Sequence, residues 1–269
     1  MRISVRPRLA SPMLAVCLVV SLLSFGPAPA AAVQAPTEPE ARLLWLINDA
    51  RQGVGRVALQ WDNRLADIAQ WRSNDMVERG YFGHISWDVL AGRINDAGIK
   101  WFGLAETLVK GTPRSPLESA EEAMQTWRNS SAHWGLLSSA DYNYVAIGMA
   151  RDSDGWYYWT ALLLKGPDRT PPTAKMTGVK RGSVTDGRRR VVVYWTGADV
   201  RLSVLTSGLR DFKLQRRRGS GDWVTVTRWT TATRKAFRLK VGKTFAFRVR
   251  ARDNKGNKST WSVPLSVTP

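Results

Sequence analysis

Residues 119–133 read SAEEAMQTWRNSSAH, and this stretch carries a strong helical signal. Its first part has the form of a capping box, Ser119-x-x-Glu122, which predicts a helix start at Ser119. The apolar residues that recur at helical spacing are Ala120, Ala123, Met124 and Trp127. One face of this helix is therefore expected to enter a core, and Ser130-Ser131 is interpreted as a tight turn before His133.

Two more helices are predicted nearer the N-terminus. Thr37-x-x-Glu40 forms a capping box for a helix that Gly53 and Gly55 end. Asp62 introduces a second helix, with Gly80 as its candidate C-cap.

The pattern then changes to β structure. Residues 144–149 and 156–164 are β-rich, and the turn 152–155 separates them. Residues 37–166 are thus predicted to form one α+β domain.

The C-terminal part has no helical periodicity. Residues 167–172, PDRTPP, are interpreted as a stiff linker. Short alternating runs follow in 173–269, separated by turn residues; they are 191–195, 212–216, 223–226, 237–239 and 245–251. This spacing predicts an all-β sandwich of about seven strands.

The first 32 residues have the features of a signal peptide. Three arginines precede an apolar run at 13–25, and small-residue cleavage patterns lie at 28–32. The run is shorter than the roughly 20 residues of a spanning helix, so no transmembrane anchor is expected. Cys17, the one cysteine, lies within this run, which leaves the mature chain without a thiol. A secreted protein, extracellular or associated with the cell envelope, is expected.

The charge of the chain is divided unevenly. The net charge is +18, yet residues 33–170 hold 14 Lys and Arg against 17 Asp and Glu. Residues 171–269 hold 23 against 5. The excess positive charge after the signal region therefore belongs to the C-terminal part and is evidence about its partners.

An ordered series of motifs occupies the N-terminal domain. In chain order they are Leu43-Leu44-x-Leu46-Ile47-Asn48, Leu59-x-Trp61-Asp62, Gly80-Tyr81-Phe82-Gly83-His84, Ala105-Glu106-Thr107-Leu108 and Trp127-x-x-Ser130-Ser131-Ala132-His133. The series resembles the bacterial branch of the CAP (SCP/PR-1-like) superfamily. The resemblance implies a three-layer α/β/α sandwich with a cleft on one side.

The resemblance carries over three cleft residues: His84, Glu106 and His133. Thr107 replaces the Asn of the family motif, and Trp134 replaces the Arg that usually follows the second His. Ser130 stands where eukaryotic members have a second cleft Glu, so the four-residue constellation is incomplete.

These side chains suit a divalent metal such as Zn²⁺. His84 and His133 are the only histidines, and converging imidazoles bind zinc. Glu106 could be a third ligand or an acceptor that fixes the tautomer of one ring. The alternative is a hydrogen-bonded polar cluster that orders the loops. Trp101, Trp134 and Ser130 are the other candidates for the cleft, which could also take a small-molecule or lipid ligand.

A binding role is favoured over catalysis. The chain has no G-x-S-x-G, H-E-x-x-H or S-x-x-K motif. The alternative is a metal-assisted extracellular hydrolase acting on peptide or cell-wall substrates, with Ser86, Ser130 and Ser131 close in sequence to the histidines.

The C-terminal part resembles a fibronectin type III module, with an immunoglobulin-like sandwich implied. Trp195 matches the buried tryptophan of that family, and residues 245–259 match strand F and its turn. Phe245 stands where the family often has the corner tyrosine.

Arginine clusters in this module predict an anion-binding surface. The residues are Arg188, Arg189, Arg190, Arg216, Arg217 and Arg218. Such charge favours anionic polymers, and for an exported protein these are cell-envelope polymers, teichoic-type phosphates or lipid head groups. Nucleic acid would match the charge equally well, but export makes it a lesser partner. The alternative is a solvated face without a partner.

Overall fold

The computed structural model describes residues 35–269. The predicted signal peptide and Cys17 lie outside these residues. Within the described part of the chain, no helix combines the length and apolar character that crossing a membrane requires.

The first two helices are predicted nearly to the residue. Helix α1 spans Glu38–Gly53, and the Glu40 carboxylate accepts a hydrogen bond from the Thr37 backbone N–H at 2.8 Å. Helix α2 spans Asn63–Glu78 with Asp62 as its N-cap. Gly80 follows at φ +66°, a left-handed conformation that glycine adopts without strain, and the chain leaves the helix there.

The predicted start of the third helix was wrong. Helix α4 spans Pro116–Asn129, and its capping box joins Ser115 to Glu118. Proline at the first helical position and the serine before it begin the helix four residues upstream of the predicted capping box. Glu122 instead accepts hydrogen bonds from Thr112.

Two helices were not predicted. Helix α3 spans Trp87–Asp96, and α5 spans Ser131–Leu137 with Ser130 as N-cap. The predicted tight turn before His133 is thus the first turn of α5, which places His133 on a helix.

A four-stranded sheet forms the centre of this part. Its strands are β1 (Gln60–Trp61), β2 (Gly103–Gly111), β3 (Tyr144–Arg151) and β4 (Tyr157–Lys165), in the order β1-β3-β4-β2. β1 runs parallel to β3, whereas β3 and β2 both pair antiparallel with β4. Strand β2 therefore lies at one edge of the sheet.

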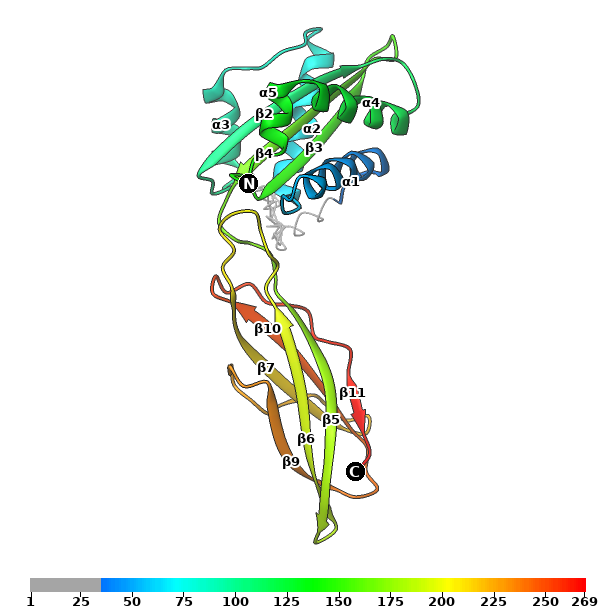
Figure 1. Ribbon diagram of the computed structural model, residues 1–269, viewed down its shortest axis with the longest axis vertical. Coiled ribbons are helices and arrows are strands. Elements are labelled where there is room, and N and C mark those ends of the chain that lie inside the picture. Colours follow the sequence, from blue (N-terminus) through cyan, green and yellow to red (C-terminus); the bar gives the residue numbers. More distant parts are fainter. Residues whose placement is uncertain (1–34) are drawn as a thin grey trace, which may run out of the picture. The chain divides into compact units, whose positions relative to one another are not determined.

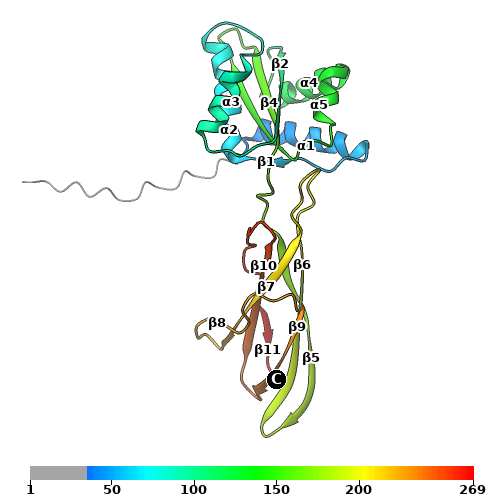
Figure 2. The same cartoon turned by 90° about the vertical axis from the view of Figure 1, so that its left-hand side faces the viewer.

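Helices cover both faces of the sheet, so this part has three layers (Figures 1 and 2). Alternate residues of β4 enter separate cores: Trp159 and Leu163 pack with α1, α4 and α5, and Leu162 and Leu164 with α2 and α3. Because β4 is buried on both faces, it has the continuous apolar sequence YYWTALLL.

The packing of α2 on β3 depends on one glycine. A Cβ at Gly148 would lie 2.2 Å from the carbonyl oxygen of Ala69 in α2. The absence of a side chain at Gly148 therefore allows the backbones of helix and strand to approach closely.

The C-terminal part is all-β. One sheet has the order β11-β10-β7-β8, and the other has the order β5-β6-β9. The strands are β5 (Thr173–Thr185), β6 (Arg188–Ala198), β7 (Leu209–Arg218), β8 (Val224–Thr225), β9 (Arg234–Lys240), β10 (Phe245–Asp253) and β11 (Leu265–Val267).

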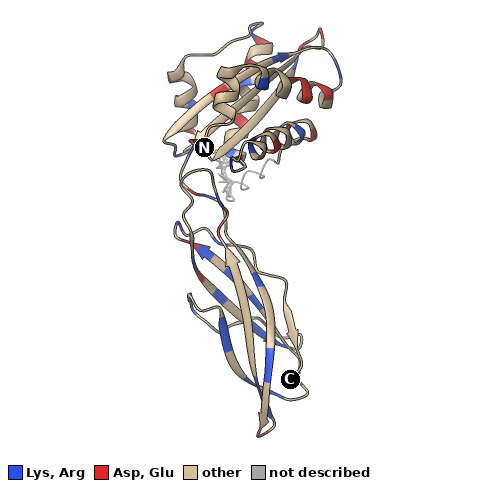
Figure 3. Cartoon of the chain, viewed as in Figure 1, with Lys and Arg blue, Asp and Glu red and all other residues tan. Residues whose placement is uncertain are grey.

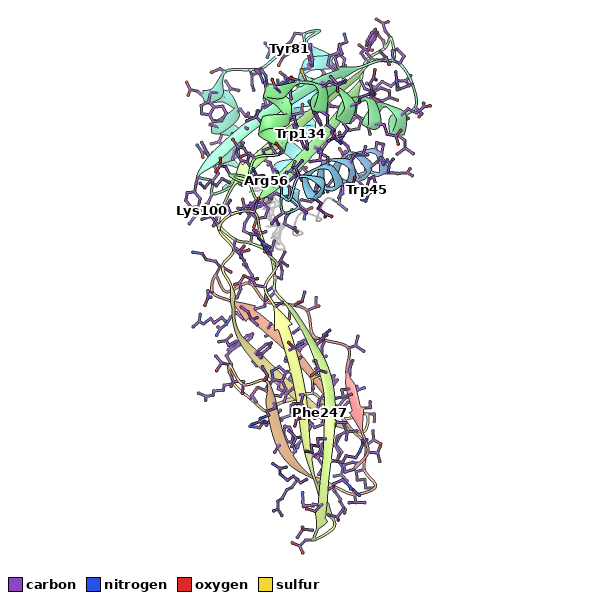
Figure 4. The ribbon with its side chains drawn as sticks, in the orientation of Figure 1. Trp45, Arg56, Tyr81, Lys100, Trp134 and Phe247 are labelled. Atoms are coloured by element: carbon purple, nitrogen blue, oxygen red, sulfur yellow. The ribbon has the colours of Figure 1, made fainter. Side chains whose placement is uncertain are left out.

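The two sheets share one apolar core. Phe247, labelled in Figure 4, lies in this core with Trp195, Leu214 and Val249. Each of the five predicted β runs contains or overlaps a strand, and the buried position predicted for Trp195 is confirmed. The finer assignment to a fibronectin type III module stays a prediction.

Candidate functional site

The site begins with a buried arginine on α2. Arg72 follows Leu65, Ile68 and Ala69 along the inward-facing stripe of the helix, and its side chain is fully buried. A guanidinium in this position requires polar partners, because an unpaired buried charge is costly.

Four groups around Arg72 meet that requirement. Its Nε donates to Glu106 Oε1 at 2.8 Å, and its two terminal nitrogens donate to the Tyr81 hydroxyl at 2.9 Å and the Gly83 carbonyl at 2.7 Å. Asp75 lies 3.5 Å away on the same helix. Arg72 thus joins α2, the loop that follows it and strand β2.

The carboxylate of Glu106 bridges Arg72 and His84. Its second oxygen, Oε2, lies 2.6 Å from His84 Nδ1. Only 5 % of the Glu106 side chain is exposed, whereas 60 % of the His84 side chain is exposed. The structure therefore brings Glu106 and His84 into hydrogen-bond distance.

This geometry assigns chemical roles to the two ring nitrogens of His84. A carboxylate can only accept, so Nδ1 carries the proton in the hydrogen bond to Glu106. In the neutral ring, Nε2 then keeps its lone pair, and this is the atom available to a metal or a proton. Arg72 fixes Glu106, and Glu106 fixes the imidazole.

Tyr81 extends the network towards the solvent. Its hydroxyl donates to the Asp75 carboxylate and accepts from Arg72. Burial and the hydrogen bond to Asp75 raise the pKa of the Tyr81 phenol.

A hollow of about 360 Å³ lies beside His84. Its lining residues are Trp71, Asp75, Arg79, Tyr81, His84, Ile85, Ser86 and Val89. Figure 4 labels Tyr81 in the loop after α2. The wall combines indole and aliphatic surface with an imidazole, a carboxylate and a hydroxyl, a composition that suits a small ligand with polar groups.

The remaining predicted cleft residues lie on other elements. His133 is half-buried on α5, and its Nδ1 is buried without a hydrogen-bond partner. Trp134 of α5, labelled in Figure 4, packs against the core to which α1 and α4 contribute. Trp101 lines a different hollow and donates to Asn95, and Ser130 caps α5. Neither His133 nor these three residues line the hollow beside His84.

The donor set can be compared with the needs of a metal. Both oxygens of Glu106 are already engaged by Arg72 and His84, which makes Glu106 the acceptor that fixes the tautomer rather than a ligand. Among residues 35–269, the only group of three acidic, histidine or cysteine side chains with ligand atoms within 4.8 Å of one another is Asp168, Asp199 and Asp253. His84 belongs to no such group of three among the described residues, so its Nε2 is the one nitrogen of this hollow that suits a metal such as zinc.

The role of Arg72 was not predicted from the sequence, although its position in the helix indicates a buried charge. It lies on an apolar helical stripe between Ala69 and Met76, a position where a charged residue needs a buried partner. Strand β2, which carries Glu106, was not predicted either.

The predicted anion-binding arginines lie on both sheets of the C-terminal part, where Figure 3 shows Lys and Arg concentrated along the strands. Arg188, Arg189 and Arg190 lie on β6, and Arg188 and Arg189 donate to backbone carbonyls. On β7, Arg216 contacts the rings of Phe237 and Phe245. Alternation along the strand places Arg217 on the opposite face from Arg216 and Arg218.

Known proteins are similar to the N-terminal part of this chain. Residues 44–163 match the model of the family described as CAP, the cysteine-rich secretory protein family. Two Bacillus subtilis proteins are similar: the "uncharacterized membrane protein YlbC", 29 % identical over 131 residues, and the "uncharacterized protein YkwD", 26 % identical over 119 residues. The matches cover 48 % and 44 % of this chain, but only 35 % and 44 % of the relatives.

Solved structures with similar regions include two bacterial surface or extracellular proteins. An outer surface protein of Borrelia burgdorferi is 18 % identical with a TM-score of 0.43; the match covers 49 % of this chain and 96 % of that one. An extracellular protein containing an SCP domain from Bacillus anthracis is 23 % identical with a TM-score of 0.39, covering 47 % and 40 %. The family-model match, on an α+β fold, supports a CAP domain in residues 44–163.

Proposed function

We propose that this protein is a secreted binding protein whose CAP domain takes a divalent metal or a small polar or lipid ligand at His84. The observation that carries the proposal is the Arg72–Glu106–His84 relay. It uses a fully buried guanidinium and a nearly buried carboxylate to hold one exposed imidazole in one tautomer. Such support is typical of a histidine that binds through its other nitrogen.

For a metal, His84 Nε2 is the proposed ligand, and zinc is the ion that suits imidazole. His133, predicted from the sequence as a second donor, lies on α5 and does not line the hollow beside His84. Glu106 would keep Nε2 of His84 free for the metal by accepting a hydrogen bond from the Nδ1–H of the ring.

The C-terminal two-sheet part is proposed to hold the protein at an anionic envelope surface. Its strongly positive composition supports this role, since clustered Lys and Arg attract polyanions through counterion release. The predicted signal peptide supports secretion, and the fibronectin type III-like assignment belongs to the same proposal.

Zinc titration of the mature chain by calorimetry tests the role of His84. We expect His84→Ala to abolish the binding and Glu106→Gln to weaken it by about 10- to 100-fold. Glu121→Gln is the matched control, because Glu121 is an exposed carboxylate paired with Arg42. Unchanged zinc affinity in His84→Ala would exclude this metal site.

A metal-assisted hydrolase is the second candidate, supported by the position of Ser86 in the same hollow as His84. A histidine held by a carboxylate can act as a general base. This candidate predicts cleavage of peptide or cell-wall substrates that stops on chelation and in His84→Ala. Cleavage that survives both treatments would place any activity elsewhere.

A further inference from the structure

Three arginines form a row on one face of β10. Phe247, Val249 and Ala251 point into the core between the sheets. The residues that alternate with them, Arg248, Arg250 and Arg252, therefore face away from that core. Residues two apart on a strand are about 6.6–6.8 Å apart, which sets the repeat of the row.

Strand β7 supplies the neighbours of the row. In the β10–β7 register, Arg248 lies opposite Gln215, Arg250 opposite Lys213, and Arg252 opposite Asp211. Arg217 continues the same face of β7 beside Ala246.

Three tryptophans from different segments lie against the arginines. Trp223 is 4.8 Å from Arg217 and 4.2 Å from Arg248, measured from guanidinium carbon to ring centroid. Trp261 is 4.7 Å from Arg248 and 4.8 Å from Arg250. We give the name Arg/Trp ladder to the set formed by Trp223, Trp229, Trp261, Arg217, Arg248, Arg250 and Arg252.

Trp229 completes the ladder at 5.5 Å from Arg250 and 4.3 Å from Arg252. Every indole thus contacts two guanidinium groups. Stacking restricts the rotamers of the arginines, so an anion would meet donors that are already oriented.

The ladder has too few acceptors for its donors. Arg252 makes two hydrogen bonds with Asp211, at 3.0 and 2.6 Å, and Arg248 donates to Gln215. By contrast, the Nε atoms of Arg217 and Arg250 are buried without a hydrogen-bond partner.

Charge within the ladder is equally unbalanced. Among residues 35–269, Asp211 is the one carboxylate that forms a salt bridge with an arginine of the ladder. Burial, and next the charges of Arg217 and Arg250, lower the pKa of the Arg248 guanidinium. The guanidinium groups repel one another, and an added anion would relieve that repulsion.

We propose that the Arg/Trp ladder binds a linear phosphate-bearing polymer of the cell envelope along the direction of β10. This proposal rests on the proposed tethering role and names its surface and its partner. Guanidinium groups bind phosphate through paired N–H donors, and a single row of charges matches a chain better than a flat membrane. Each indole already stacks with two guanidinium groups, which disfavours the base stacking that single-stranded nucleic acid uses.

The opposite sheet offers a matched control surface. Lys180, Arg190, Arg234 and Lys235 surround a hollow of about 430 Å³ with Tyr194. These cations lie on β5, β6 and β9, away from the ladder's sheet. They provide comparable charge without tryptophan stacking.

Binding of the mature chain to synthetic poly(glycerol phosphate), measured by surface plasmon resonance over a range of salt, tests the proposal. We expect Arg217→Gln/Arg250→Gln to lose at least tenfold in affinity. The slope of log affinity against log salt should fall by about 1.5, because each lost phosphate contact removes about 0.7–0.9. The control Lys180→Gln/Arg234→Gln, on the opposite sheet, should lose less than threefold.

A charge-preserving pair separates oriented binding from general attraction. Arg217→Lys/Arg250→Lys keeps the charge but loses the planar donors, and we expect it to bind at least fivefold more weakly than the wild type. Equal losses in the ladder and control pairs would overturn the proposal, as would wild-type affinity in the lysine pair. Tighter binding to oligo(dT) of equal charge would assign the face to nucleic acid instead.

Two further measurements complete the test. If a ladder variant unfolds, arginine Nε–H NMR of the wild type replaces it: the signals of Arg217 and Arg250 should shift on adding polymer, and unshifted signals contradict the proposal. If the wild type binds whole envelopes but not the polymer, the polymer is not the partner of the ladder, whereas the tethering role is retained. Binding to neither would refute the tethering role as well.

Discussion

Substitution of Arg72 by Met removes the centre of the polar network while keeping most of its volume. Glu106, only 5 % exposed, then loses its hydrogen bond to the buried guanidinium, and the Gly83 carbonyl loses its donor. Breaking one partner of a buried ion pair costs about 3–5 kcal/mol, because the remaining charge stays buried. We expect Arg72→Met to lower the free energy of unfolding by this amount in urea denaturation.

A double-mutant cycle isolates the pair. Arg72→Met/Glu106→Gln leaves no uncompensated charge, so the double variant should be more stable than the sum of the two single losses by about 1–3 kcal/mol. The exposed pair of Arg42 and Glu121 is the control, and Arg42→Met should cost at most about 1 kcal/mol. Additive losses, or a cost below about 1 kcal/mol for Arg72→Met, would refute the reasoning.

Tyr81→Phe should cost about 1 kcal/mol at pH 8, the net worth of the hydroxyl's hydrogen bonds with Asp75 and Arg72. The pKa of Tyr81 in the folded protein is raised above 10.0, so this contribution to stability is complete below pH 10 and is lost as the pH rises through the folded pKa. Urea denaturation of the wild type and Tyr81→Phe at several pH values measures this. A difference in unfolding free energy that grows above pH 10 would contradict the reasoning. Gly148→Ala should destabilise the chain by about 3 kcal/mol, because its Cβ would meet the α2 backbone, whereas Gly92→Ala on α3 meets nothing within 4 Å and should be neutral or slightly stabilising. Equal thermal midpoints for the two alanine variants would show that helix and strand can separate at little cost.

The parts of the fold that follow local rules were predictable from sequence. The capping box at Thr37 and the left-handed Gly80 set the ends of the first two helices, and the continuous apolar run of β4 marked a strand covered on both faces. The start of α4 was misplaced because Ser119-x-x-Glu122 and Ser115-x-x-Glu118 have the same form. The proline at Pro116 distinguishes them.

The contacts of the candidate site join residues that are far apart in the sequence, so local sequence patterns could not predict them. The pairing of His84 with Glu106 followed from the family resemblance, not from spacing, since 22 residues separate them. Arg72 was missed because its role depends on a strand that local sequence did not predict. The Arg/Trp ladder was missed for a similar reason: period-two arginines in β10 were visible, but three tryptophans from separate segments meet them only in the folded chain.

The central claim is that Glu106 holds His84 with Nε2 free to bind. Long-range ¹H–¹⁵N NMR of the mature chain, with zinc added stepwise, measures this directly. We predict that His84 carries its proton on Nδ1 before zinc is added and that its Nε2 signal then shifts while Nδ1 stays protonated. A proton on Nε2 at the outset, or an Nε2 signal that zinc leaves unchanged, would contradict the proposed metal-binding role.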